Sequence, residues 1–319
     1  MTKNIDWEKN LGRRLRLRDL HVFFRVVQCG SMAKAALDLG VSQPSISEVI
    51  AGLEHAVGVR LLERSSQGVE TTVYGRALLR RGQTAFDELR QGIRDIEFLA
   101  DPTSGEVRLG CAEIAAPGLL SPIIDRLSRE YPRIAIKVSP YTVGPPDASG
   151  LPQGKLDLVI SPLPRISLAD QYRIEVLLND TIRIVVGEKS RWAARRKVHL
   201  SELADERWIM TPPETPMASC VRGAFQAIGL EMPKIYLEAG SIHLRNQLLS
   251  TGRFVSAMAT SVLRSNASQF GLRMLPIELP AADLPLNAIT MKNRTLTPVV
   301  EVFLQCARSV AKAMRKGSV

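Results

Sequence analysis

The sequence has few residues that could form disulfides, bind a metal or cross a membrane. Only four of its 319 residues are cysteine and four are histidine. The cysteines are far apart, so no C-x-x-C pair exists and no zinc or redox motif is expected. No apolar run approaches the roughly 18 residues of a membrane span, and the charged N-terminus is unlike a secretion signal. We therefore expect a cytoplasmic protein with no membrane contact, no metal and no cofactor.

Sequence signatures of catalysis are also missing. Neither G-x-G-x-x-G nor G-x-x-x-x-G-K-[ST] occurs. Ser31 and Lys34 match the S-x-x-K spacing of some serine enzymes, but Ser31 stands where it can begin a short helix. We expect no catalytic residue.

Positive charge is the clearest compositional bias. The chain has 42 Lys and Arg against 32 Asp and Glu, a formal net charge of +10. Such a balance permits binding to nucleic acid. The excess is +3 over residues 1–100 and +7 over the rest, so it is not concentrated at one end. A local cluster forms an N-terminal arm that either contacts phosphate or is simply solvated: Arg13, Arg14, Arg16 and Arg18.

Residues 1–72 have the pattern of a winged helix-turn-helix. Apolar residues recur at helical spacing over residues 17–27. Ser31 is a suitable N-cap for a second helix, and Ser42 for a third that has Pro44 in its first turn. A short turn with glycine between two helices is typical of a helix-turn-helix. Two short strands, over residues 59–64 and 69–71, follow as a hairpin or wing.

Residues 73–100 predict one long helix that begins after Thr72. Seven residues follow a 3-4 spacing that is typical of a coiled coil: Leu79, Gly82, Phe86, Leu89, Ile93, Ile96 and Ala100. We expect this seam to pair two chains. The alternative is an amphipathic helix that lies on its own domain.

Residues 105–319 alternate strand-like and helix-like segments. Alternation of this kind predicts a parallel α/β sheet. Ligands of such sheets bind beyond the carboxyl ends of the strands.

The first hundred residues resemble the LysR-type transcriptional regulators. The order and spacing of the matching segments need no gap; they are Leu20–Phe24, Gly30–Ala36, Val41–Ser47, Leu53-Glu54, Gly58–Arg64 and Thr72–Gly75. The resemblance implies a DNA-binding domain over residues 1–72 and a dimerising linker helix over residues 73–100. It also implies a two-lobed, periplasmic-binding-protein-like α/β domain over residues 105–319, with a small effector between the lobes. The expected lobes are lobe I, about 105–162 and 270–319, and lobe II, about 163–269.

The third helix is expected in the major groove of double-stranded DNA. Gln43 can bond to adenine, and Pro44 can contact a thymine methyl group. Further contacts to bases or phosphates are expected from small or helix-capping side chains and from one arginine of the wing. These residues are Ser31, Ser42, Ser45, Ser47, Thr72 and Arg64. Glu48 departs from the arginine that many family members carry there, and we expect it to alter base preference.

The effector is expected to contact residues that follow the strands of both lobes. These are Ala112, Glu113, Ile114, Ser161, Thr211, Arg253 and Phe254. Family members often hold a carboxylate with hydroxyls at the positions of Ala112 and Ile114, which this chain lacks. A second departure is residues 144–152, where three prolines replace a short helix that the family usually has.

The resemblance further implies a homotetramer, a partly palindromic DNA site and contact with RNA polymerase. Two alternatives remain open. One is an architectural or replication-associated DNA binder without an effector. The other is an enzyme on a periplasmic-binding-like fold, for which Glu113 is the one carboxylate expected at the ligand cleft.

Overall fold

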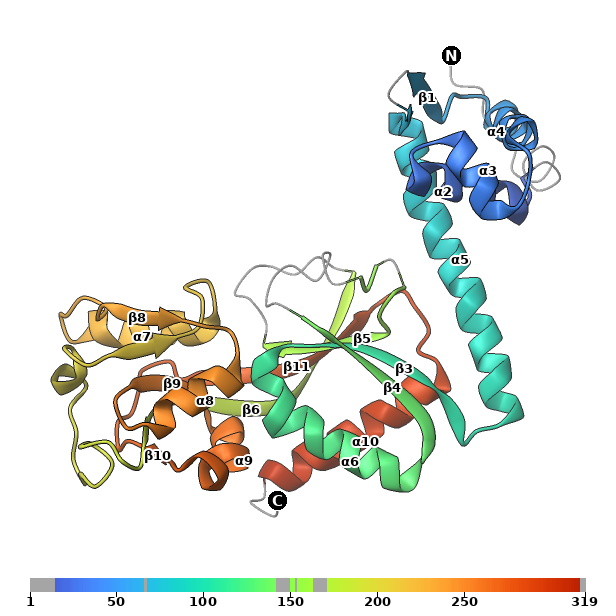
Figure 1. Ribbon diagram of the computed structural model, residues 1–319. Helices are drawn as coiled ribbons and strands as arrows, with labels where there is room; N and C mark the ends of the chain where they lie inside the picture. Colours follow the sequence, from blue (N-terminus) through green and yellow to red (C-terminus); the bar gives the residue numbers. More distant parts are fainter. Residues whose placement is uncertain (1–14, 66–67, 142–149, 153, 163–170, 316–319) are drawn as a thin grey trace. The chain divides into compact units, whose positions relative to one another are not determined.

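The computed structural model describes residues 15–65, 68–141, 150–152, 154–162 and 171–315 (Figure 1). Arg13 and Arg14 of the arginine arm and residues 144–149 of the proline-rich segment therefore lie outside the described residues. The chain divides into two compact units, residues 1–89 and 90–319, and each is described by itself. In the described part, no helix is both long and apolar enough to cross a membrane.

The first unit contains three short helices and a hairpin in the expected order. They are α2 (Leu17–Cys29), α3 (Met32–Leu39), α4 (Gln43–Val57), β1 (Leu62–Ser65) and β2 (Gly68–Thr71). The hydroxyls of Ser31 and Ser42 accept hydrogen bonds from the backbone amides of Lys34 and Ser45, which confirms both as N-caps. Gly40 ends α3 with a φ of 65°, a left-handed conformation that favours glycine.

The core of the first unit packs α4 against the other two helices. Phe23 of α2 and Ile46, Ile50 and Leu53 of α4 are almost completely buried. Burial of a side chain of this size contributes about 1.5–3 kcal/mol. The opposite face of α4 therefore stays exposed on a firmly held helix.

Helix α5 extends over Val73–Ala100, the range that the sequence predicts. Thr72 is its N-cap, because its hydroxyl accepts a hydrogen bond from Gly75 N at 3.0 Å. The seam splits into two parts. Leu79, Gly82 and Phe86 pack on the first unit: Phe86 meets Phe24 edge-on, with ring centroids 5.5 Å apart, and a Cβ on Gly82 would touch Phe24. The seam residues after Phe86 are exposed: Leu89, Ile93, Ile96 and Ala100.

The second unit has two lobes that share strands. In lobe I the strand order is β4 (Arg133–Pro140), β3 (Ser104–Cys111), β5 (Leu158–Pro162), β11 (Asp283–Met291) and the first part of β6 (Tyr172–Gly187). Helices α6 (Ser121–Glu130) and α10 (Pro298–Arg315) pack on these strands.

Lobe II continues the sheet from the second part of β6. Its further strands are β9 (Val255–Ala259), β7 (Trp208–Met210), β8 (Ile235–Glu238) and β10 (Leu272–Met274). Its main helices are α7 (Pro216–Ala227), α8 (Ile242–Ser250) and α9 (Thr260–Phe270).

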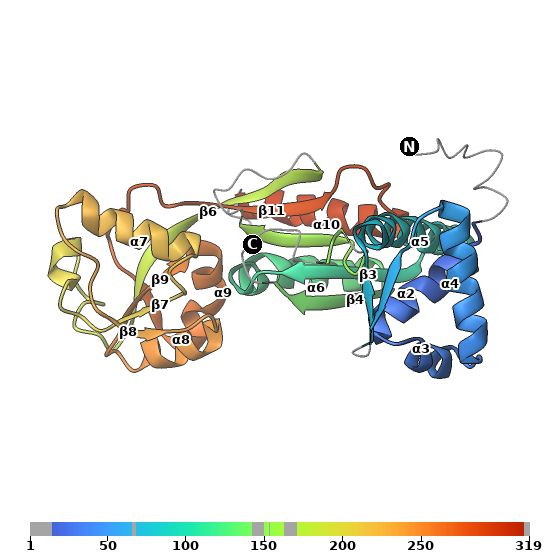
Figure 2. The same cartoon turned by 90° about the horizontal axis from the view of Figure 1, so that it is seen from above.

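The expectation of a parallel sheet is wrong at the junction of the lobes. β3 pairs with β4 and β5 in parallel, and β7 pairs in parallel with β8 and β9. β11, however, runs antiparallel to both β5 and β6, and β6 runs antiparallel to β9. β6 passes from one lobe into the other (Figures 1 and 2), and β11 begins at the junction, where Asp283 pairs with Thr181. The crossover lies near Thr181, not at residue 162, and β10 belongs with lobe II.

Candidate functional site

The first turn of α4 presents a row of exposed side chains. Gln43, Pro44 and Ser45 are exposed, and Glu48 is exposed one turn later. The hydroxyls of Ser42 and Ser45 lie 2.9 Å apart. This end of the helix thus carries hydroxyl and amide groups that can donate or accept hydrogen bonds, together with one apolar ring.

Other residues expected at DNA are engaged within the chain. Ser47 is half-buried, and its hydroxyl donates toward Met32 Sδ at 3.5 Å, so it faces α3. Thr72 donates its hydroxyl to Arg60 O at 2.8 Å while it accepts from Gly75 N. Arg64 lies in β1, opposite Val69, and its side chain is outside the described residues.

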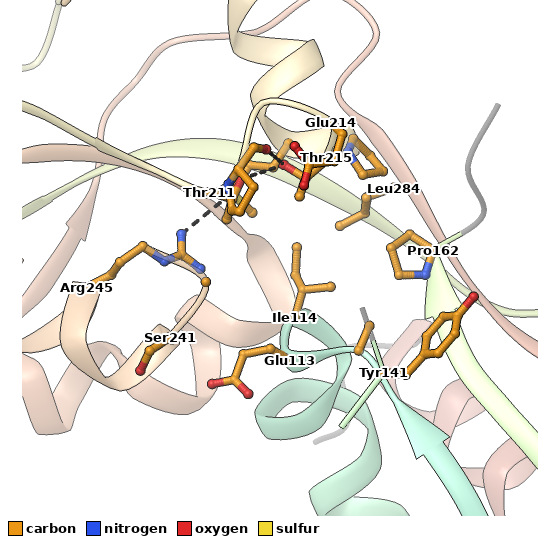
Figure 3. Close-up of a pocket in the computed structure, with 15 residues that line it drawn as sticks. Glu113, Ile114, Tyr141, Pro162, Thr211, Glu214, Thr215, Ser241, Arg245 and Leu284 are labelled. Carbon is orange, nitrogen blue, oxygen red and sulfur yellow. Dashed lines mark hydrogen bonds between the residues drawn. The ribbon is translucent and has the colours of Figure 1, made fainter. Parts of the chain in front are cut away.

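A cavity of about 420 Å³ lies between the lobes of the second unit (Figure 3). Four of the expected effector residues line it: Ala112, Glu113, Ile114 and Thr211. Ala112 and Glu113 follow β3, and Thr211 follows β7. Both positions are strand ends, where ligand sites of α/β sheets form. Further lining residues lie in β5, β11, α7 and α8 or in the connections after β4, before α7 and before α8: Tyr141, Pro162, Pro212, Glu214, Thr215, Pro216, Met217, Gly240, Ser241, Arg245 and Leu284.

Three of the expected effector residues lie elsewhere. Ser161 is fully buried in β5 and donates its hydroxyl to Pro162 O, so its neighbour Pro162 faces the cavity instead. Arg253 stacks over the ring of Phe254 at 5.6 Å. Phe254 is buried beside Tyr236 and is not among the cavity-lining residues. The connection between α8 and β9 therefore supplies packing rather than a cavity wall.

A hydrogen bond at the cavity joins the two lobes. Glu113 of lobe I accepts a hydrogen bond through Oε1 from the backbone N–H of Ile242, the first residue of α8, at 3.2 Å. Ser241 caps the same helix by accepting from Leu244 N. A carboxylate at a helix N-terminus is stabilised by the free amides and the helix dipole.

Sequence reasoning missed Arg245, which lines the cavity from α8. Its side chain is only 1% exposed. Nη1 donates to Ala257 O at 3.2 Å, and Nε has no hydrogen-bond partner among the described residues. Burial lowers the pKa of Arg245 to about 10, and the nearby Glu113 carboxylate opposes that shift. The side chain therefore remains a cation at neutral pH. The sequence signal that could have indicated Arg245 is its position one helical turn after the N-cap Ser241.

The polar groups on the lobe II wall include two threonines. Thr211 Oγ1 and Thr215 Oγ1 lie 2.6 Å apart, and Thr215 also caps α7 by accepting from Ala218 N. The cavity thus combines hydroxyls, one buried cation and apolar surface, which is the usual make-up of a small-molecule site.

A helix-turn-helix unit followed by a two-lobed domain with a central cavity defines a DNA-binding regulator with a ligand-binding domain, and sequence comparison gives the family. Residues 17–76 match the family described as "Bacterial regulatory helix-turn-helix protein, lysR family", and residues 100–312 match "LysR substrate binding domain". The chain belongs to the LysR family of transcriptional regulators.

Individual relatives agree with this assignment. The HTH-type transcriptional regulator GbpR of Azospirillum brasilense is 26% identical over 302 residues, which cover 94% of this chain and 88% of GbpR. HinK, a LysR family regulator from Pseudomonas aeruginosa, is 27% identical with a TM-score of 0.54, over 92% of this chain and 98% of HinK. Full-length CbnR complexed with its target DNA is 22% identical with a TM-score of 0.53, over 93% of this chain and all of that chain, and this likeness concerns the fold.

Proposed function

We propose that the first turn of α4 reads base edges in the major groove of a partly palindromic DNA site. The observation that carries this proposal is the exposed row Gln43, Pro44 and Ser45 on a helix whose other face is buried in a core. Recognition helices of this class contact bases with their N-terminal residues. CbnR, which shares the fold, is complexed with its target DNA.

Residues around this turn supply the remaining contacts of the proposal. Ser31 and Ser42 lie at helix N-termini, where phosphates bind favourably. Arg64 of the wing and Thr72 contact the sugar-phosphate backbone of the DNA. Ser47 contributes a small side chain that lets the helix approach the DNA closely, and not a hydrogen bond, because its hydroxyl faces Met32. Glu48 selects against some bases, since a carboxylate accepts only from donors such as cytosine N4.

A small molecule in the cavity between the lobes modulates the activity in this proposal. Ala112, Glu113, Ile114 and Thr211 are its contacts among the residues named from the sequence. Because the relatives are named as transcriptional regulators, we propose binding and release of this effector rather than a reaction.

The second half of the α5 seam pairs two chains in this proposal. Leu89 is 48% exposed, Ile93 58% and Ile96 67%, and they recur along one face of the helix. An apolar stripe of this kind is costly in water and is buried when two helices pair. Two such dimers form a tetramer that contacts RNA polymerase, in the cytoplasm where the chromosome lies.

Capture of genomic DNA tests the proposal. The purified full-length protein is incubated with fragmented genomic DNA at moderate salt, and the retained fragments are sequenced. We expect an inverted repeat that is shared by a few upstream regions, with half-sites about 34–36 Å apart or a multiple of that distance. The double substitution Gln43→Ala, Ser45→Ala should abolish this enrichment, whereas Gln226→Ala, at an exposed position of α7, should keep it. Retention of fragments without a shared sequence would support the architectural alternative.

A further inference from the structure

In the part of the chain that the structure describes, the guanidinium of Arg245 is a buried charge without a carboxylate hydrogen-bond or ion-pair partner. It is 1% exposed, and its Nη1 donates to two neutral atoms, Ala257 O at 3.2 Å and Met217 Sδ at 3.7 Å. Nε lacks any partner among the described residues. An unpaired buried cation costs several kcal/mol, so such a group normally meets a counter-ion.

The carboxylate of Glu113 acts electrostatically on Arg245 but accepts a hydrogen bond from another group. Glu113 is the acidic group that acts on Arg245, yet its Oε1 accepts from Ile242 N at the start of α8. Figure 3 shows Glu113 and Arg245 at the same end of the cavity, next to Ser241. Glu113 of lobe I thus places a negative charge at this end of the cavity but forms no ion pair with the guanidinium.

The remaining walls select the rest of the ligand. Among the described lining residues Arg245 is the one basic side chain, whereas Glu113 and Glu214 are acidic. A second negative charge on the ligand would therefore be repelled. Most other walls are apolar, including Ile114, Met217 and Leu284.

We propose that the effector is a small organic monocarboxylate with an apolar body, and that its carboxylate pairs with Arg245. The proposal rests on the function proposed above and names the ligand class of that site. Arginine binds carboxylates through two parallel N–H donors, and the pair is strong where water is excluded. Lobe II thereby supplies the anion contact that Ala112 and Ile114 of lobe I cannot make.

Matched probes test the charge requirement on the full-length protein. Phenylacetate, phenylacetamide and phenethylamine share one ring and differ in charge; hexanoate is a second carboxylate of another shape. At about 10 mM, roughly ten times the dissociation constant expected of a fragment, phenylacetate or hexanoate should raise the Tm by about 3 °C. The amide and the amine should raise it by less than a third of that. Acetate at the same concentration controls for ionic strength.

Variants assign the effect to the residue. Arg245→Met should abolish the Tm shift, and methionine suits the buried position. Arg253→Met removes an exposed arginine outside the cavity and should keep the shift. Glu113→Gln should tighten phenylacetate binding about threefold, because it removes a like charge. If Arg245→Met does not fold, the Tm shifts of the wild-type protein with phenylacetate, phenylacetamide and phenethylamine test whether the ligand must carry a negative charge.

The outcomes separate this proposal from the function on which it rests. Equal shifts with acid and amide, a larger shift with the amine, no shift with either carboxylate, or a shift retained by folded Arg245→Met would each overturn the ligand class. The same protein batch is used for genomic DNA capture. A shared DNA site without a carboxylate effect overturns only this inference, whereas retention without a shared site overturns the regulatory function.

Discussion

Glu113 and Ile242 connect the two lobes: the carboxylate of one accepts a hydrogen bond from the backbone amide of the other at 3.2 Å. Glu113→Ala should free this amide. A hydrogen bond to a charged acceptor contributes about 1.5–3 kcal/mol, less where the acceptor is exposed as here, so we expect about tenfold faster hydrogen exchange at Ile242. Mass spectrometry of peptides over residues 240–250 measures it. Glu231→Ala, at an exposed site, is the control, and unchanged exchange would show that the bond does not hold the lobes.

Charge on the exposed part of the α5 seam should break the proposed dimer. Ile93→Arg places a cation in a stripe that helix pairing would bury. We expect the mass from light scattering to fall to that of one 35.1 kDa chain at micromolar concentration. Thr84→Arg adds the same charge at an exposed position on the other face of α5 and should leave the mass unchanged. A wild-type mass of one chain would contradict the dimer itself.

Two glycines of α5 should respond oppositely to alanine. A Cβ on Gly75 would collide with the carbonyl oxygen of Leu61, while a Cβ on Gly92 meets no atom within 4 Å. Gly75→Ala should lower the free energy of unfolding of the first unit by about 1–3 kcal/mol. Gly92→Ala should raise stability by up to about 1 kcal/mol, because alanine favours helix. Urea unfolding followed by circular dichroism compares them, and equal effects would contradict the packing at Leu61.

Glu48 should influence which bases are chosen. It is exposed on α4, one turn after Ser45. Glu48→Ala should relax preference at one position of each half-site by a factor of about 5–10, within the range of single base contacts. Selection from a randomised half-site library measures this. An unchanged preference would make Glu48 a solvated residue without a role in recognition.

Acid should weaken the contact between β6 and α10. Arg308 donates Nε to Glu175 Oε1 at 2.7 Å and Nη2 to Oε2 at 2.9 Å, and these hydrogen bonds lower the pKa of Glu175. A carboxyl with a lowered folded pKa stabilises above its unfolded pKa, near 4.3, and loses that contribution as the pH falls through the folded pKa. Because the pair is partly exposed, Glu175→Gln should cost about 1 kcal/mol at pH 7 and progressively less below pH 4. Urea titrations at several pH values test this; a cost that is independent of pH would contradict it.

Local signals predicted the first unit well. Ser31, Ser42 and Thr72 each cap the helix that follows, because capping depends on a few neighbouring residues. The apolar spacing of the α5 seam predicted the helix but not which of its residues pack on the first unit. Leu79 and Phe86 have the same spacing as Ile93, and periodicity does not distinguish a helix that packs on its own domain from one that packs on a partner.

Non-local pairing limited the prediction of the second unit. Nothing near β11 in the sequence indicates that it runs antiparallel to β5 and β6. The cavity wall from lobe I was predicted because Ala112 and Glu113 follow a clear strand. Arg245 was missed because an arginine in a short helix is ordinarily exposed, and its burial depends on Met217 and Ala257 from other elements.

The division of lobe I along the sequence has a consequence for synthesis on the ribosome. Gly105 in β3 packs against Val299 in α10, and nearly two hundred residues separate them. β11 and α10, which complete the core of lobe I, are translated after all the strands and helices of lobe II. The nascent chain can therefore close lobe II first, while β3, β4 and β5 wait with an uncovered apolar face. Contacts between such distant segments form slowly, so lobe I is the part of this protein most dependent on protection from aggregation before translation ends.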